Sequence, residues 1–578
     1  MVPARAPMLL DVCCSRMAAI LSEDFSAQAQ TLDLPLDLLC KILLELPPLP
    51  LHYLEQCASG QYEEGFSLAW KSLAECHHNT LLKHGTWKDA YWEAHVQACL
   101  NAVTTKLAAP NFDGQIGDLL VPEALVYRIG ARNAACCEDS DFTSLKNTIP
   151  LLSRYVKSLR LRSVLCSSEL LSLFDSAELA SLSFLNIKTS TQFGLIINLL
   201  ARNVRALRRL EFHYCKFFEQ DFNTLLGMLK SADVLSDFAI TCSSIQVPWA
   251  SLEMQQFLRS CRSLACVHLV SNRMHTQFTS SIVVELFSLS SLDTLDFADN
   301  LLESCFESPT VNQFFINCAV KQLPFTPGLK VLNLKSCFLS SACVQNLVHY
   351  LKCLPHLHTL NLSDNPVADE GIKSVACCLQ TSLSALMELN VAGCELSWNG
   401  LSSLLDSLVS TNHRLRSLSV ADNSFGRSGS AVLAKYLQKS AVKELDISEI
   451  GLGSLGCSSE LASALIQNQT LEHLNISKNR IAFPGAELLH AVISKGQGVL
   501  TDINASFNLL NVEAMKRLAS ALQTKAALGG RMKRLDLLGN PGIPPPGANL
   551  FGSFSEGPDA IVLLSSSQFY VPLHDDDP

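Results

Sequence analysis

Three stretches decide the fold of this 578-residue chain: LHTLNLSDNPV at 357–367, LMELNVAGCEL at 386–396 and LRSLSVADNSF at 415–425. Each matches the template LxxLxLxxN/CxL, and successive copies begin about 29 residues apart. The two central apolar residues are two positions apart, so on a short strand both side chains point to the same inward face. The sequence therefore predicts a short strand that recurs along the chain with one face buried.

Six further clear copies and five weaker ones extend the pattern in both directions, to fourteen units with a mean step of about 29 residues. The units begin at Val156, Leu182, Leu207, Leu235, Leu264, Leu292, Leu329, Leu357, Leu386, Leu415, Val442, Leu471, Leu500 and Met532. The rest of each unit, as in 371–379, has apolar residues at the three-and-four spacing of a helix. The 37-residue step from Leu292 to Leu329 predicts a longer loop within that unit. No unit can bury its own apolar face, so neighbours must stack and both ends need caps.

The ninth position of the template is Asn or Cys, and the two alternate through Cys337, Asn365, Cys394 and Asn423. A side chain in this turn can bond backbone groups that the strand leaves unpaired. Strand–turn–helix units of 28–29 residues with this alternation resemble the ribonuclease-inhibitor type of leucine-rich repeat. The resemblance covers residues 151–545. It implies an α/β fold, a leucine-rich-repeat solenoid shaped as a ribonuclease-inhibitor-like horseshoe of about 14 repeats.

The sequence divides into four parts. Residues 1–30 are expected to be a mobile N-terminus, and residues 31–150 a small helical domain that precedes the repeats. The repeats occupy 151–545. Residues 546–578 form a C-terminal cap with a Pro/Gly loop, one closing strand at about 560–565 and an acidic tail.

Composition excludes several classes of function. The chain has 44 Lys and Arg against 54 Asp and Glu, a net charge of −10, so we expect no nucleic acid and no membrane as partner. Its 48% hydrophobic content excludes wholesale disorder, and no apolar run reaches the roughly 18 residues that span a bilayer. The 22 cysteines are scattered and the start is a poor secretory signal, so we expect a reducing compartment, cytoplasmic and/or nuclear.

The segment before the repeats contains a predicted amphipathic helix that begins near Pro35 and ends before Pro47. Leu36, Cys40 and Leu44 follow an i, i+4, i+8 spacing and so form one stripe of this helix. The pattern PLxxxCxxxL resembles the elongin BC box, and the wider run is similar to an F-box. With the repeats behind it, the layout resembles the Muf-type BC-box leucine-rich-repeat substrate receptors.

That resemblance implies docking on elongin B/C, or on a Skp-type adaptor, and through it on the cullin of a ubiquitin ligase. It assigns Leu36 as the pocket-filling leucine, with Cys40 and Leu44 along the same stripe. A second interpretation stays open, in which residues 31–150 are only a helical cap over the first repeat.

Two sequence patterns could indicate a nucleotide site or a metal site, and neither has the context that such a site needs. Gly451, Gly453 and Gly456 match GxGxxG, but they follow a repeat strand where a turn into a helix is already required. A His/Cys group in the helical segment lacks the paired spacing of zinc sites. The group is Cys76, His77, His78, His84, His95 and Cys99. We therefore predict no enzyme activity, no metal and no cofactor.

The residue between the two strand leucines is expected to line the inner face of the array. Along the units these residues are Arg160, Asn186, Glu211, Ala239, His268, Asp296, Asn333, Asn361, Asn390, Ser419, Asp446, Asn475, Asn504 and Asp536. The Asn and Asp from Asn333 on are best explained by a preference of the repeat itself. Residues 151–218 differ, with ten Lys and Arg against four Asp and Glu, so this end either forms a solvated face or meets an acidic partner.

The candidate residues for contact with a protein target come from the inner face of the early units. They are Arg160, Arg162, Glu211, His213, His268 and Asp296. The sequence supports two hypotheses. The first is a substrate-recognition subunit of a cullin–RING ubiquitin ligase, which recruits a protein target through the repeats. The second is a ligase-independent leucine-rich-repeat scaffold or inhibitor that binds one protein partner through its concave face.

Overall fold

The computed structural model divides the chain into two units, Met1–Gln246 and Val247–Pro578, which are described separately. The residues that it describes are 9–23, 32–58, 60–80, 82, 85–108, 115–131, 142–245, 252–274, 276–320, 327–411, 414–495, 499–542, 550–554 and 561–564. Among them, no helix is both long and apolar enough to cross a bilayer. The predicted acidic tail and the Pro/Gly loop over 543–549 lie outside the described residues.

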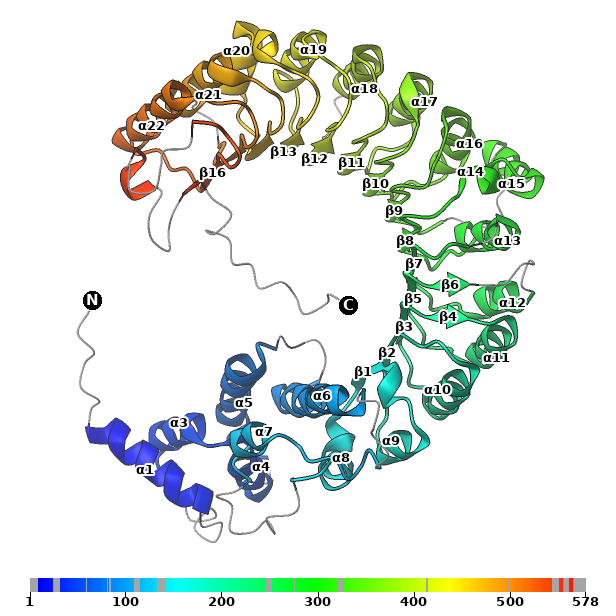
Figure 1. Cartoon of the computed structure of the whole chain (residues 1–578), viewed down its shortest axis with the longest axis vertical. Coiled ribbons are helices and arrows are strands. Elements are labelled where there is room, and N and C mark those ends of the chain that lie inside the picture. The colour runs from blue at the N-terminus through cyan, green and yellow to red at the C-terminus, as the bar shows by residue number, and fades with distance from the viewer. Residues whose placement is uncertain are drawn as a thin grey trace. The chain divides into compact units, whose positions relative to one another are not determined.

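The first unit begins with helices, as expected for residues 31–150 (Figure 1). They are α1 (Leu9–Glu23), α3 (Leu36–Glu45), α4 (Pro48–Cys57), α5 (Glu63–His78), α6 (Trp87–Leu107), α7 (Glu123–Arg128) and α8 (Leu145–Leu152). The core between α5 and α6 is aromatic: the ring centroid of Trp70 lies 5.6 Å from that of Tyr91 and 5.8 Å from that of Trp92. All three side chains are buried, which joins the two helices into one body.

Helix α1 corrects the expectation that residues 1–30 form only a mobile terminus. Residues Leu9–Glu23 are helical, and α1 packs on α3. Cys14, Ala18 and Leu21 are buried and recur at four- and three-residue spacing, which is the apolar stripe of a packed helix. The stripe was missed because Asp11 and Arg16 interrupt the apolar run in sequence; in the helix Arg16 is exposed, away from the buried stripe.

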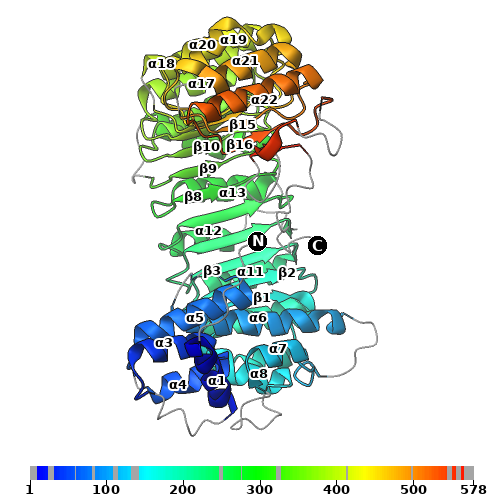
Figure 2. The same cartoon turned by 90° about the vertical axis from the view of Figure 1, so that its left-hand side faces the viewer.

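Helix α6 also closes the free edge of the first repeat strand (Figure 2). Glu93 Oε2 accepts hydrogen bonds from the backbone N–H groups of Lys157 and Ser158, at 2.8 and 2.7 Å. One helical turn later, Gln97 Oε1 accepts from the N–H of Arg160 at 2.9 Å and Gln97 Nε2 donates to its carbonyl at 3.0 Å. Two side chains on one helix face therefore take the place of a neighbouring strand.

Four parallel strands follow in the first unit, in sequence order, with helices on their outer side. The strands are β1 (Ser158–Arg162), β2 (Ser181–Leu185), β3 (Arg209–His213) and β5 (Asp237–Thr241), and the helices are α9 (Ser168–Leu173), α10 (Ser190–Asn203) and α11 (Glu219–Leu229). A separate two-stranded sheet pairs β4 (Lys216–Phe217) with β6 (Ser244–Ile245).

The register of β2 corrects one assignment. Ser183, and not Asn186, lies opposite Glu211 and takes the inward position of this unit. The unit therefore begins at Leu179 rather than Leu182. Leu179 and Leu182 are both buried, and either can stand at the first leucine position of the template. The sequence alone therefore allowed the start of this unit to be placed three residues too late. Asn186 instead follows the strand with a left-handed φ of 61°, a conformation that asparagine tolerates.

In the second unit ten further repeat strands and one closing strand are parallel and ordered as in the sequence. They are β7 (Cys266–Val270), β8 (Thr294–Asp296), β9 (Val331–Asn333), β10 (Thr359–Asn361), β11 (Glu388–Asn390), β12 (Ser417–Ser419), β13 (Glu444–Asp446), β14 (His473–Asn475), β15 (Asp502–Asn504), β16 (Arg534–Asp536) and β17 (Val562–Leu563). Within the described residues, β1, β2, β3, β5 and β7–β16 supply one strand for each of the fourteen predicted repeats. The closing strand expected at about 560–565 is β17, which pairs with β16.

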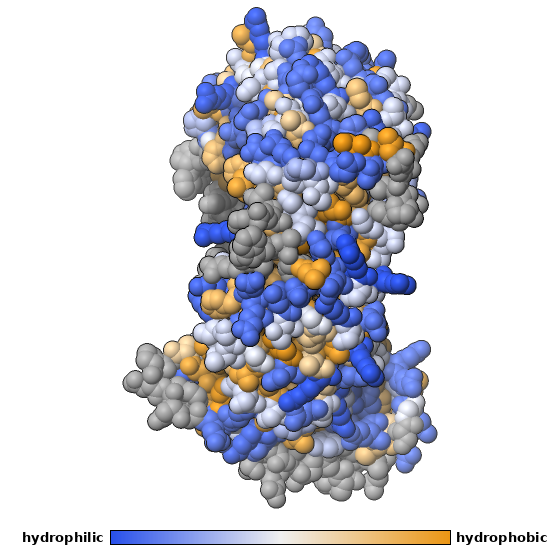
Figure 3. Space-filling view, turned by 90° about the vertical axis from the view of Figure 1, so that its right-hand side faces the viewer, coloured by the Kyte–Doolittle hydropathy of each residue, from blue (hydrophilic) through white to orange (hydrophobic). Residues whose placement is uncertain are grey.

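Helices cover the outer side of these strands (Figure 1). They are α12 (Leu252–Ser260), α13 (Thr276–Phe287), α14 (Glu303–Phe306), α15 (Pro309–Ala319), α16 (Ser341–Leu351), α17 (Ala368–Thr381), α18 (Trp398–Ser410), α19 (Ser428–Leu437), α20 (Ser459–Gln467), α21 (Ala482–Lys495) and α22 (Val512–Ala527). The face of the molecule in Figure 3 shows apolar residues interspersed with hydrophilic ones. Helices α14 and α15 correct the longer loop predicted after Leu292: Ser308 Oγ caps α15 by accepting from the N–H of Val311 at 3.4 Å, and Pro309 begins the helix.

The turn asparagines confirm the role predicted for the ninth template position. Asn365 Nδ2 donates to the carbonyls of Leu334 and Leu362, both at 2.8 Å, and its Oδ1 accepts from the N–H groups of Cys337 and Leu339 at 2.8 and 3.0 Å. One buried amide thus ties two repeats together. Asn300, Asn423, Asn479, Asn508 and Asn540 bond backbone groups in the same way.

Candidate functional site

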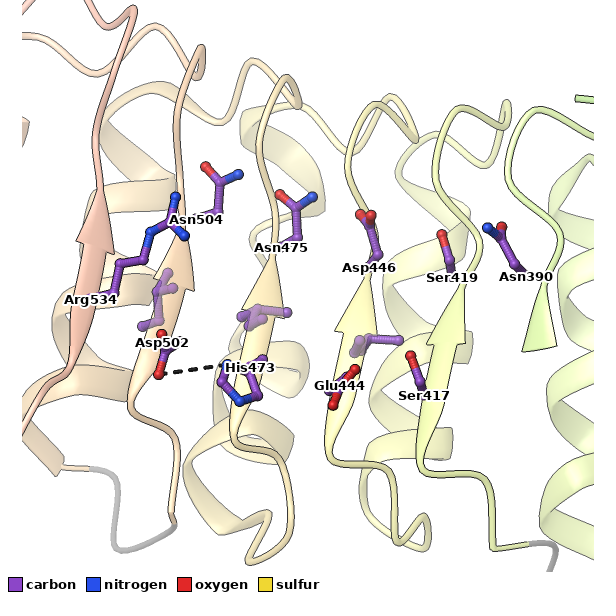
Figure 4. Close-up of a pocket in the computed structure, with 13 residues that line it drawn as sticks. Asn390, Ser417, Ser419, Glu444, Asp446, His473, Asn475, Asp502, Asn504 and Arg534 are labelled. Atoms are coloured by element: carbon purple, nitrogen blue, oxygen red, sulfur yellow. Dashed lines mark ion pairs between the residues drawn. The ribbon is translucent and has the colours of Figure 1, made fainter. Parts of the chain in front are cut away.

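The inner face of the second unit has a shallow groove of about 560 Å³ across strands β11 to β16 (Figure 4). Its walls are polar side chains that project from the strands, while the leucines between them point into the core. In Figure 4 these side chains form two parallel rows, because each strand contributes the residue before and the residue after its central leucine. A partner that lies in the groove can therefore contact both rows of polar side chains at once, across several strands.

The row that follows the central leucine explains the run of Asn and Asp from Asn333 on. Each side-chain Oδ1 accepts the backbone N–H two residues later, at 3.0 Å for Asn390, 2.9 Å for Asp446 and 3.1 Å for Asn504. This Asx turn redirects the chain out of the strand, so the residue type is required by the repeat. The bond also fixes the orientation of each amide.

The row that precedes the central leucine is free of that constraint. The strand register aligns Glu388, Ser417, Glu444, His473, Asp502 and Arg534 across β11 to β16. His473 Nδ1 lies 3.6 Å from Asp502 Oδ2, and Arg534 Nη2 lies 3.1 Å from Asp536 Oδ2. The repeat template does not reveal this row, because it places no requirement on the residue before the central leucine. The signal was available: with a side-chain period of two, the residue two positions earlier faces the same way.

Four of the residues predicted to contact a partner lie on the first unit. Arg160 and Arg162 are exposed on β1, and Glu211 and His213 are half-buried on β3. A hydrogen bond with His213, the nearby His213 charge and the guanidinium groups of Arg209 and Arg160 lower the pKa of Glu211. The structure therefore brings Arg160, Glu211 and His213 into one electrostatic cluster.

His213 is held on two sides within that cluster. Its Nε2 lies 3.5 Å from Glu211 Oε2, and its Nδ1 lies 2.6 Å from Thr241 Oγ1. The guanidinium of Arg209 bonds Asp237 Oδ1 at 2.9 Å, so the inner face here alternates in charge and is not uniformly basic. The other two predicted residues lie on the second unit, where His268 Nδ1 is 3.5 Å from Asp296 Oδ2.

The stripe of α3 is a separate surface on the first unit. Leu36 is 56% exposed and Leu44 50% exposed, and Cys40 between them is half-buried. The helix packs through the side next to this stripe, where Leu39 and Leu43 are fully buried. The three residues therefore lie together on a side of the helix that the fold of this unit only partly covers, and large apolar side chains there are available to a partner.

Three histidines of the helical domain pack against the aromatic residues of its core. His52, His78 and His95 lie against Tyr91 and Trp92, and burial is the main cause that lowers their pKa values, to about 3, 4 and 3. Among the described residues, no group of three or more His, Cys, Asp or Glu is arranged to hold a metal ion. His84 of the predicted group lies outside the described residues.

The GxGxxG stretch forms a turn, which was the interpretation favoured by its place in the repeat. Gly451 and Gly453 have left-handed φ angles of 70° and 62°, and a short 3₁₀ helix follows over Ser454–Gly456. The Gly453 N–H donates to the carbonyl of Asn479 in the next repeat at 3.0 Å. The glycines therefore serve the stacking of repeats.

Comparison with known proteins agrees with the repeat architecture. Residues 353–376 and 467–489 match the family model described as "Leucine Rich repeat". The chain is similar to "NACHT, LRR and PYD domains-containing protein 5" of Homo sapiens, with 29% identity over 214 residues, which are 37% of this chain and 17% of that protein. It is also similar to "NACHT, LRR and PYD domains-containing protein 3" of Homo sapiens, with 31% identity over 241 residues, 41% of this chain and 22% of that protein.

A third relative is "NACHT, LRR and PYD domains-containing protein 14" of Mus musculus, 30% identical over 202 residues, 35% of this chain and 20% of that protein. The chain thus spans about a fifth of the length of the curated relatives that it matches. One conclusion follows from the stacked parallel strands, the outer helices, these matches and the buried turn asparagines from Asn300 to Asn540, which together form an asparagine ladder. The chain is a leucine-rich-repeat protein.

Proposed function

We propose that this protein is a substrate-recognition subunit of a cullin–RING ubiquitin ligase, and that it works in the cytoplasm or nucleus. In this role α3 binds an adaptor of the elongin B/C or Skp type, and the inner face of the repeats binds a protein target. The observation that supports the adaptor contact is the exposure of Leu36 and Leu44 at the two ends of the stripe, while Leu39 and Leu43 beside them on the same helix are fully buried.

The mechanism in this proposal is proximity. The repeats hold a target and the adaptor holds the ligase, so the transfer of ubiquitin between them becomes effectively intramolecular. An apolar side chain such as Leu36 contributes about 1.5–3 kcal/mol when it moves from water into a closed pocket. Two such side chains with Cys40 between them provide a compact hot spot, in which a few anchors dominate the binding energy. The protein itself makes and breaks no bond.

Co-purification of the full chain with recombinant elongin B/C, and separately with a Skp-type adaptor, tests this proposal. The double variant Leu36→Glu, Leu44→Glu should lose the adaptor that the wild-type chain captures, because two charges would have to be buried in an apolar pocket. Leu68→Glu is the matched control, since Leu68 on α5 is 60% exposed and lies outside the stripe. It should leave capture unchanged.

Two outcomes would contradict the proposal: capture of neither adaptor by the wild-type chain, or equal capture by the double variant. A stable one-to-one complex with a protein target in the absence of any adaptor would instead favour the scaffold or inhibitor role. The groove on β11 to β16 is the observation that supports this second role, because it is complete within the chain and needs no adaptor to form.

A further inference from the structure

The two inward rows of strands β8 to β16 are acidic. They present eighteen side chains, among which are six carboxylates and one guanidinium, that of Arg534. The carboxylates are those of Asp296, Glu388, Glu444, Asp446, Asp502 and Asp536. Arg534 is already paired with Asp536, so the remaining face attracts a cationic partner.

The carboxylates in the row before the central leucine are regularly spaced. Glu388, Glu444 and Asp502 lie on β11, β13 and β15, which are alternate strands, at equivalent register positions. Neighbouring strands are about 4.8 Å apart, so these three side chains recur about every 9.6 Å. Ser417 and His473 separate them on β12 and β14.

A polyproline II helix matches this repeat. It has three residues per turn and rises about 3.1 Å per residue, so every third residue lies on the same face, about 9.3 Å along the axis. A β-strand places residues i and i+3 on opposite faces, so three cations at that spacing cannot reach one row. An α-helix needs seven residues for two turns, about 10.5 Å, and gains about 2 Å of misalignment over three carboxylates.

The row of side chains that follows the central leucine supplies hydrogen-bond donors for the backbone carbonyls of such a ligand. A polyproline II helix makes no internal hydrogen bonds, so its carbonyls need outside donors. Asn390, Asn475 and Asn504 each have Oδ1 held by a backbone N–H, at 3.0, 3.2 and 3.1 Å. In the described part of the chain their Nδ2 groups donate to no protein acceptor, and Figure 4 shows these side chains in the row beside Glu444 and Asp502.

We propose that this face binds a segment of a protein target in polyproline II conformation, with Arg or Lys at every third position. Glu388, Glu444 and Asp502 each bind one cation, and the amides of Asn390, Asn475 and Asn504 bind backbone carbonyls between them. The inference rests on the target-binding part of the proposed function and is independent of the adaptor.

The three carboxylates differ in how open they are to a ligand. Glu388 is exposed, and the nearest cation to Glu444 is Arg416, whose Nη2 is 3.7 Å away on a side chain that is 62% exposed. An exposed pair at that distance is screened by solvent and exchanges readily for a ligand cation. Asp502 is 22% exposed; it accepts a hydrogen bond from Thr501 Oγ1 at 2.9 Å, and its Oδ2 lies 3.6 Å from His473 Nδ1, so both neighbours orient the carboxylate.

Binding of labelled peptides to the full chain tests the proposal. The first peptide has three arginines at every third position in a proline-rich sequence, and the second has the same composition with the arginines adjacent. The third is a helix-forming peptide with arginines seven residues apart. We expect the first to bind about tenfold more tightly than the other two, measured by fluorescence anisotropy at low salt, with affinity falling as salt is added.

Glu388→Gln, Glu444→Gln, Asp502→Asn should weaken the first peptide about tenfold or more, because charge is lost while shape is kept. The matched control changes three carboxylates on outer helices, Glu370→Gln, Glu487→Gln, Glu513→Gln, and should change affinity less than about twofold. Equal binding of the first two peptides, tighter binding of the helical one, an equal loss in the control, or no binding at all would each overturn the proposal. Adaptor capture by the same preparation separates such a failure from a failure of the ligase role.

Discussion

Gln97 pairs its side-chain amide with both backbone hydrogen-bonding groups of Arg160, 63 residues later in the chain. The amide supplies an acceptor at 2.9 Å and a donor at 3.0 Å, which is the pattern that a neighbouring strand would present. An uncovered first strand would leave a row of unpaired N–H and C=O groups, which promotes association with other chains. Helix α6 thus caps the free edge of the first repeat strand.

Replacement of Gln97 should therefore destabilise the first unit. We expect Gln97→Ala to lower its free energy of unfolding by about 1–2 kcal/mol, since two solvent-accessible hydrogen bonds are lost. Gln97→Glu keeps the acceptor for the Arg160 N–H and loses only the donor, so it should cost less. Urea denaturation followed by circular dichroism measures both. If both variants unfold like wild type, the amide is not needed as a cap.

The contrast between this contact and the repeats shows what a sequence can reveal. The period of about 29 residues identified the strands and the role of residues such as Asn365, because stacked units must satisfy the same bonds at the same position each time. The pairing of Gln97 with Arg160 occurs once, so no periodicity marks it. Helix α1 was missed for the same reason, since its partner α3 has no repeat to reveal it.

Prediction of the candidate surfaces was uneven for a related reason. Leu36, Cys40 and Leu44 were found because helical spacing alone places them in one stripe. The row of Glu388, Glu444 and Asp502 was missed because the repeat template leaves that position free, and only the strand register shows that the three side chains align. Positions that the repeat does not need are therefore the ones at which specificity can be encoded.

The buried histidines predict a stability that depends on pH. His52, His78 and His95 have lowered pKa values in the folded protein, so between about pH 4 and 6.5 the unfolded chain binds more protons than the folded one. Stability is thus fully present above about pH 6.5 and is lost as the pH falls. For His95, the most buried, the loss is up to about 1.4 kcal/mol for each pH unit.

Denaturation of the full chain between pH 5 and 7.5, followed by tryptophan fluorescence, measures this effect, since Trp70 and Trp92 lie in the same core. His95→Phe is the informative variant. It keeps a ring beside Tyr91, where the two rings stack at an interplanar angle of 7°, and removes the titrating group. Its slope of stability against pH should be shallower than that of wild type. An unchanged slope would mean that His95 does not contribute.

The asparagine ladder predicts a graded cost of mutation. Asn423 is buried and donates to the carbonyls of Val391 and Val420 while it accepts from the N–H of Cys394 at 3.1 Å. Asn423→Ala should cost about 3 kcal/mol or more, because several buried backbone groups lose their partner together.

Two further variants calibrate that cost. Asn423→Cys should be milder than Asn423→Ala, since the thiol of Cys394 already bonds the Leu362 carbonyl at 3.1 Å in the neighbouring repeat. Asn361→Ala removes one half-buried Asx bond to the Ser363 N–H and should cost about 1 kcal/mol. Equilibrium denaturation of the three variants gives the ranking, and an equal cost for Asn361 and Asn423 would contradict the ladder as the main tie between repeats.

The buried and the exposed leucines of α3 should separate folding from docking. Leu39 and Leu43 are fully buried, so replacement of either by alanine should cost about 2–5 kcal/mol in the unfolding of the first unit. Leu36 and Leu44 are half exposed, so the same replacement should cost less than about 1 kcal/mol while it weakens adaptor capture. Denaturation curves and adaptor co-purification on the same four variants measure both effects.

Because each pair is matched in residue type, helix and substitution, only burial distinguishes the two pairs. A large stability loss at Leu36 or Leu44 would assign the stripe to the core and remove the structural support for docking.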